Sequence, residues 1–144
     1  MSEDRSVDVF SVLILIFSII AIILEIIGPF AGFYLGGGQY RYSCLDCEYS
    51  TGIDYAMQIL AIILLVIQII IALNELIPNK FIKMEVTKYG MILAILTLVF
   101  AIIGIASFGI TYAFYEWWPD LGFYGLAIGG LINTILFFLK QKNI

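Results

Sequence analysis

Four long apolar runs divide the chain, and Glu25, near the end of the first run, is the one charged residue within them. The runs predict helices over about residues 9–27, 55–73, 89–113 and 121–139. A helix of about 20 apolar residues crosses the hydrocarbon core of a bilayer, where the backbone must bond within its own element. The alternation that a membrane β-barrel requires is absent. We therefore expect an all-α membrane protein, with four transmembrane helices in one antiparallel bundle over residues 1–144.

Composition and charge support a place in lipid and suggest an orientation. Charged residues make up 12% of the chain and apolar residues 62%, which leaves too few charges to cover a soluble domain. Lys and Arg collect on the cytoplasmic side of membrane proteins. Of the seven Lys and Arg residues, only Arg41 lies outside the two termini and the loop 74–88. We therefore expect both termini and the inner loop 74–88 in the cytoplasm, and the outer loop 28–54 on the other side.

The outer loop contains both cysteines of the chain, Cys44 and Cys47, at a C-x-x-C spacing. Alternating side chains flank them on both sides, a pattern typical of strands. We expect a small β-hairpin whose four-residue turn runs from Cys44 to Cys47. Since the outer side is usually oxidising, we expect a disulfide to clamp this turn. The glycines at 36–38 are expected to form a hinge. Three tyrosines of the hairpin are candidates for partner contacts: Tyr40, Tyr42 and Tyr49.

Four spans with a C-x-x-C in the first outer loop resemble the bacterial quinone-coupled disulfide-forming proteins of the DsbB type. That resemblance implies thiol–quinone exchange through Cys44 and Cys47. It covers the topology and this one motif, because the second outer loop, FYEWWPD, has no cysteine pair and no arginine follows the motif closely. The acidic neighbours Asp46 and Glu48 also disfavour a thiolate. With two Cys and no His, the chain lacks the four ligands of a structural zinc site, so we expect no metal and no cofactor.

The layout is also similar to that of claudin-like four-span proteins. Both combine short inner termini, a longer first outer loop with strands and a disulfide, and a short second outer loop. In that family the cysteines lie farther apart and follow a Trp-containing signature, whereas Trp117 and Trp118 here fall in the second outer loop. The similarity is therefore one of layout alone. The two tryptophans predict an aromatic belt at the membrane interface and are further candidates for partner contacts.

Glu25 is the candidate ionisable group within the membrane. Lipid penalises charge, so such a group is a functional candidate that could bind a cation, relay protons or donate a hydrogen bond. Alternatively, Glu25 lies close enough to the outer interface to reach water or Arg41.

Small residues on two spans predict close helix packing. The fourth span has Gly125-x-x-x-Gly129 with Asn133 one turn further on, and the third has Gly104 in a stripe of small residues. These stripes would form either an oligomer interface or a contact within one chain. The short second outer loop favours the second interpretation, with the two stripes facing each other.

Together these features predict a non-enzymatic integral membrane protein, a structural or accessory subunit of a larger complex such as one in a virion or archaeal membrane. It would assemble with itself or with partner subunits through its outer hairpin and helix faces. Thiol–quinone exchange and a small oligomeric pore remain as alternatives. A net charge of −4 without a basic stripe gives no reason to expect a nucleic-acid partner.

Overall fold

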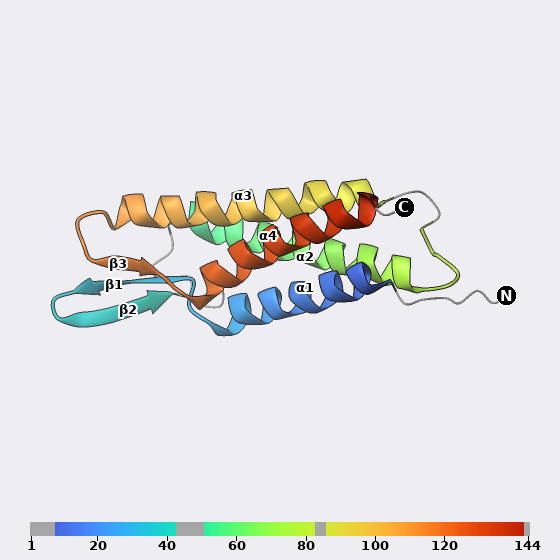
Figure 1. Cartoon of the computed structure of the whole chain (residues 1–144). Helices are drawn as coiled ribbons and strands as arrows, with labels where there is room; N and C mark the ends of the chain where they lie inside the picture. The colour runs from blue at the N-terminus through green and yellow to red at the C-terminus, as the bar shows by residue number, and fades with distance from the viewer. Residues whose placement is uncertain (1–7, 43–50, 83–85, 143–144) are drawn as a thin grey trace.

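The computed structural model describes residues 8–42, 51–82 and 86–142 (Figure 1). Within these residues, four helices and three short strands follow one another in the order α1 Val9–Ile27, β1 Ala31–Leu35, β2 Gly38–Tyr42, α2 Ile53–Leu76, α3 Thr87–Thr111, β3 Trp117–Pro119 and α4 Leu121–Lys142.

The four helices confirm the four predicted spans. Each is long and apolar enough to cross a membrane, so the protein is an integral multi-pass membrane protein. The helices pack as a ring in which α1 contacts α2 and α4, and α3 contacts α2 and α4 (Figure 1). Their bounds differ from the predicted ones by at most three residues at either end. An apolar run of membrane-spanning length thus suffices to locate a helix.

The sheet differs from the predicted hairpin. Strand β2, which contains Tyr40 and Tyr42, pairs with β1 on its N-terminal side, with Phe33 opposite Tyr40. The turn between them consists of Gly36 and Gly37, both with positive φ (60° and 83°). Two residues of positive φ form the hairpin turn that matches the twist of two antiparallel strands, and glycine adopts this conformation without strain. The predicted turn and disulfide at Cys44 and Cys47 lie outside the described residues.

Strand β3, from the loop between α3 and α4, completes the sheet, whose order is β2-β1-β3. It pairs antiparallel to β1, with Gly32 opposite Trp118. Two further backbone hydrogen bonds flank the pairing: Tyr34 donates to Glu116 (2.8 Å) and Asp120 donates to Phe30 (2.9 Å). The sheet therefore joins both loops at one end of the bundle, which we call the sheet end.

The opposite end is held by an ion-pair network, and we call it the basic end. Lys140 in the last turn of α4 donates a hydrogen bond to Asp8 and lies 3.4 Å from Glu75 of α2. Lys80 also pairs with Glu75, at 3.2 Å. Asp8 caps α1 by accepting hydrogen bonds from the Ser11 backbone and hydroxyl. One network therefore joins α1, α2 and α4.

Replacing Asp8 with Asn should make the free energy of unfolding depend less on pH in the acid range. Burial alone would raise the pKa of Asp8, but its hydrogen bonds with Lys140 and Ser11 outweigh burial and lower the pKa below 3.8. A carboxylate whose pKa is lowered by folding stabilises the fold above its unfolded pKa, and that contribution is lost as the pH falls through the folded pKa. We expect Asp8→Asn to cost about 1 kcal/mol at pH 7.

The measurement is the free energy of unfolding in detergent at pH 7 and pH 3. The difference in the free energy of unfolding between the wild type and Asp8→Asn should be smaller at pH 3 than at pH 7. Glu116→Gln, at an exposed position, is the control, and its free energy of unfolding should stay close to that of the wild type at both pH values. A difference that stays constant over this range would contradict the ion pair.

Candidate functional site

The side of the sheet that faces away from the helices carries four large polar or aromatic side chains: Tyr34, Gln39, Arg41 and Trp118. We call it the exposed sheet face. Strand register places Trp118, Gly32 and Arg41 in one row across the sheet, and Tyr34 beside Gln39 in the next. Side chains alternate between the two faces of a strand, and Phe33 points into the core, so Gly32 and Tyr34 point outward.

Contacts within the exposed sheet face hold its aromatic rings in place. The Trp118 indole covers Gly32, where a Cβ atom would lie 2.5 Å from the ring. Its Nε1 donates to Asp120 (3.0 Å), and its ring centroid lies 4.9 Å from that of Tyr34. The Tyr34 hydroxyl accepts a hydrogen bond from Gln39 (3.0 Å). Arg41 is exposed and makes no ion pair with the part of the chain that the structure describes.

The other side of the sheet packs on α3 through a cluster of aromatic rings. Phe33 stacks on Tyr112 with 4.2 Å between ring centroids, and Tyr42 stacks on Phe108 at 5.9 Å. Tyr42 is 1% exposed, and it also bonds to Gln58 of α2. Such burial of aromatic area fixes the sheet on the bundle and gives the exposed sheet face a rigid support.

The residues predicted as partner contacts divide between the two sides of the sheet. Tyr42 is buried and Tyr40 stacks on Phe33, so both belong to the packing on the bundle. Trp117 lies against α3, where a Cβ atom at Gly109 would be 2.4 Å from its ring. Trp118 belongs to the exposed sheet face, and Tyr49 lies outside the described residues.

Sequence reasoning missed Tyr34, Gln39 and Arg41. The sequence did contain a signal for them. Alternating side chains flank the three glycines at 36–38, and two alternating runs joined by glycines are typical of a β-hairpin.

Glu25 lies inside the bundle, near the sheet end. Its side chain is 0% exposed, and neither carboxylate oxygen has a hydrogen-bond partner among the described residues. It packs against the start of α4, where a Cβ atom at Gly122 would lie 2.8 Å from Oε2. The expected alternative, in which Glu25 reaches water, does not fit this burial. A buried carboxylate without a partner costs free energy, which makes Glu25 a functional candidate.

Replacing Glu25 with Gln should therefore stabilise the fold. Gln has nearly the same shape and carries no charge, so it removes the cost of burying a carboxylate. We expect a gain of about 1–2 kcal/mol in the free energy of unfolding at pH 7, measured in detergent. The same change at exposed Glu116 is the control. A loss of stability in Glu25→Gln would show that the carboxylate has a partner in the folded protein.

A hydrogen-bond network occupies the middle of the bundle and takes one side chain from each helix. Asn133 of α4 donates to Ser18 of α1 and to Gln68 of α2, both at 2.8 Å. Gln68 donates in turn to Thr97 of α3 (2.9 Å), which bonds to the backbone of Leu93. All four side chains are fully buried. Polar side chains that bond to one another in this way tie helices together in lipid.

The small-residue stripes are buried within the chain, but they do not face each other. Gly125 and Gly129 pack against α1, where Cβ atoms would lie 2.9 Å from Leu24 and 2.8 Å from Ala21. Gly104 of α3 faces the side of α2 and Phe30. Close contacts between α3 and α4 are instead made at Gly130 and Gly90, which sequence reasoning did not single out.

Among the described residues, no group of three or more Cys, Asp, Glu or His side chains could hold a metal ion. No protein-family model matches the chain, and no curated protein or solved structure matches it either.

Proposed function

We propose that this protein is a non-enzymatic membrane subunit that binds another protein, a second copy or a partner subunit, through its exposed sheet face. The observation that carries the proposal is the group of Trp118, Tyr34 and Arg41 on a rigid sheet that packs against the last turns of α3. Trp, Tyr and Arg are the residue types that dominate the binding energy of protein interfaces. Here Trp118 and Arg41 lie in one row across the sheet, and Tyr34 lies in the next row. Contacts with Gly32 and Asp120 hold the Trp118 side chain, and the hydrogen bond from Gln39 holds Tyr34.

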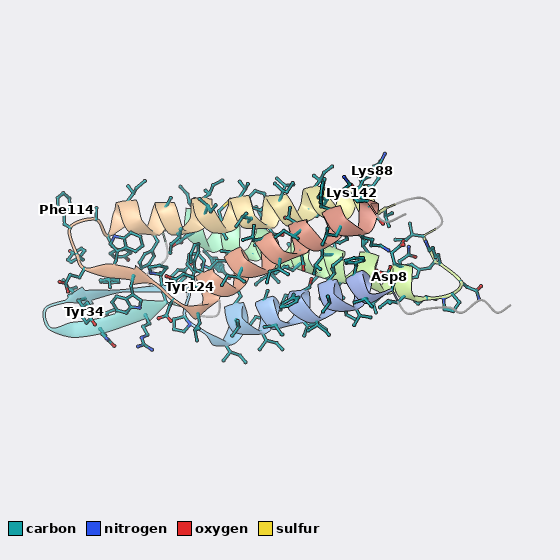
Figure 2. All side chains as sticks on the ribbon, in the orientation of Figure 1. Asp8, Tyr34, Lys88, Phe114, Tyr124 and Lys142 are labelled. Carbon is teal, nitrogen blue, oxygen red and sulfur yellow. The ribbon has the colours of Figure 1, made fainter. Side chains whose placement is uncertain are left out.

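Further apolar exposure at the same end supports this proposal. Phe114, in the loop before β3, is 99% exposed, and Leu35 at the tip of the hairpin is also exposed. Figure 2 shows Phe114 and Tyr34 at the sheet end, with Asp8, Lys88 and Lys142 at the basic end. Lys and Arg favour the cytoplasmic side, so the sheet end would lie outside. Apolar side chains that together form one patch exposed to water mark interaction sites.

Burial of the other polar side chains disfavours a pore through a single bundle. The midplane side chains bond to one another and are fully buried, so they do not line an open path.

The test reverses the charge of Arg41. We expect Arg41→Glu to weaken assembly at least about tenfold, because like charges across an interface are strongly unfavourable. The readout is the size distribution of complexes extracted from native membranes in mild detergent. Lys88→Glu makes the same change at the basic end and should leave the distribution unchanged. A wild-type protein extracted only as a monomer, or an Arg41→Glu variant that assembles normally, would refute the proposal.

The thiol–quinone alternative has its own test. Cys44→Ser and Cys47→Ser variants that assemble normally but lose thiol oxidation would establish exchange chemistry in place of the proposed function.

A further inference from the structure

A groove of about 240 Å³ runs between α1 and α4 on the side of the bundle that faces lipid. Its walls are the side chains of Phe17, Ile20 and Leu24 from α1, and of Leu121, Tyr124 and Ile128 from α4. Four of these six are exposed, and the Tyr124 hydroxyl is their one polar side-chain group. Figure 2 shows Tyr124 near the start of α4, toward the sheet end.

The floor of the groove is built from small residues: Ala21, Gly125 and Gly129. The glycines let α1 approach α4 so closely that a Cβ atom on either would clash with α1. All three floor residues are buried, so α1 already covers the surface that a glycine motif would otherwise offer to a second helix.

The groove extends over one leaflet of the bilayer. It begins at Leu121, the first residue of α4, and ends at Gly129, one turn before Asn133 of the midplane network. At 1.5 Å per residue this is about 12 Å along the helix, close to half of the hydrocarbon core of about 30 Å.

The shape and chemistry of this space select its occupant. Apolar cavities stay dry, so water does not fill it. A helix has a diameter of about 10 Å, too thick to enter a groove of this volume whose floor is already covered. An empty groove would lose the van der Waals contacts of its lining. A flexible acyl chain is much thinner than a helix and can follow the apolar walls of the groove.

We propose that this groove binds one acyl chain of a phospholipid from the leaflet at the sheet end. Bulk lipid is as apolar as the groove, so the hydrophobic effect contributes nothing to the preference, which comes from packing contacts. We expect the groove to favour a chain about fivefold over the lipid-facing surface of α3 around Ile92 and Ile102, which corresponds to about 1 kcal/mol.

The test uses a phosphatidylcholine probe with a photoreactive diazirine midway along one acyl chain. The full-length protein is reconstituted in phosphatidylcholine bilayers with a trace of this probe, illuminated, and mapped for adducts by mass spectrometry of peptides. We expect adducts at Leu24 and Tyr124 about fivefold above those at lipid-facing Ile92 and Ile102 of α3. Even labelling of all exposed positions would overturn the proposal.

Two matched variants decide whether the groove itself is responsible. Ile128 and Ile135 are both half-exposed on α4 and lie two turns apart, but only Ile128 lines the groove. Ile128→Trp should fill the groove and reduce adducts at Tyr124 about fivefold, whereas Ile135→Trp should leave them unchanged. If Ile128→Trp fails to fold, Ile20→Trp fills the groove from the other wall. Unchanged labelling in a folded groove-filling variant, or crosslinks from this groove to a second copy, would overturn the proposal.

Discussion

Gly130→Ala should destabilise the protein strongly, because the added methyl group would meet the backbone of a neighbouring helix. A Cβ atom at Gly130 would lie 2.9 Å from the backbone nitrogen of Leu98 and 3.2 Å from its Cα. The obstacle is the backbone of α3, which cannot rotate away, so α3 and α4 must separate. Overpacking of this kind costs about 1–3 kcal/mol, and we expect a value near the upper end even after Ala's gain in helix propensity.

Gly104→Ala is the matched control for this prediction. It adds the same methyl group to a buried helical glycine, but the nearest atoms would be side-chain atoms of Phe30 and Met57 at 3.3 and 3.4 Å. These contacts are close to ordinary packing, so we expect a change of less than about 1 kcal/mol. Unfolding of both variants in mixed detergent measures the difference. Equal stability of the two would contradict the close contact between α3 and α4.

Asn133→Leu should also cause a large loss, because Asn133 connects three helices at the middle of the bundle. Leu has a similar volume, so the change mainly removes the hydrogen bonds to Ser18 and Gln68. It also leaves Gln68 Oε1 without this donor in an apolar environment. Hydrogen bonds between helices in membranes contribute about 0.6 kcal/mol on average, with a maximum near 1.7. We therefore expect a loss of about 1–3 kcal/mol.

Thr134→Val is the matched control for Asn133→Leu. Thr134 is the next residue along α4, and its hydroxyl donates to the backbone of Gly130 within the same helix. Removing this bond should change stability by less than about 0.5 kcal/mol, since no second helix is involved. If Asn133→Leu were as stable as Thr134→Val, the four helices would not be joined by the midplane network.

The helices could be predicted from the sequence because each span has a local cause. A run of about 20 apolar residues must satisfy its own backbone in lipid, and this holds whatever the neighbouring helices do. Gln68 could be assigned to contacts between helices for the same reason, since a polar amide in lipid needs a partner. In the structure its partners are Thr97 and Asn133.

The sheet could be predicted only in part because strand pairing is not local. The alternation around Tyr40 and Tyr42 continues in both directions, so it fits a partner strand on either side. The cysteine pair favoured the later turn, whereas Gly36 and Gly37 form the observed one. Strand β3 has three residues, one of them a proline, and its pairing with β1 spans most of the chain. No short-range pattern indicates such a contact.

The contacts of the glycines in α4 could also be predicted only in part. A helix in a four-helix ring packs on two neighbours, and the sequence does not tell which neighbour each glycine faces. Gly129 and Gly130 are adjacent in the sequence, yet one packs on α1 and the other on α3. Spacing therefore predicts that a glycine permits a close approach, but not which helix approaches it.

Crosslinking from the exposed sheet face in native membranes tests the central claim most directly. A photoreactive amino acid placed at Gln39, on the edge strand β2 of that face, should form a defined adduct with a second copy or a partner protein. The same amino acid at exposed Tyr89 at the basic end should not form that adduct. Adduct formation at Gln39 that is lost in the Arg41→Glu background is the predicted result. If Gln39 forms no protein adduct in native membranes, the exposed sheet face is not an interface and the proposed function is wrong.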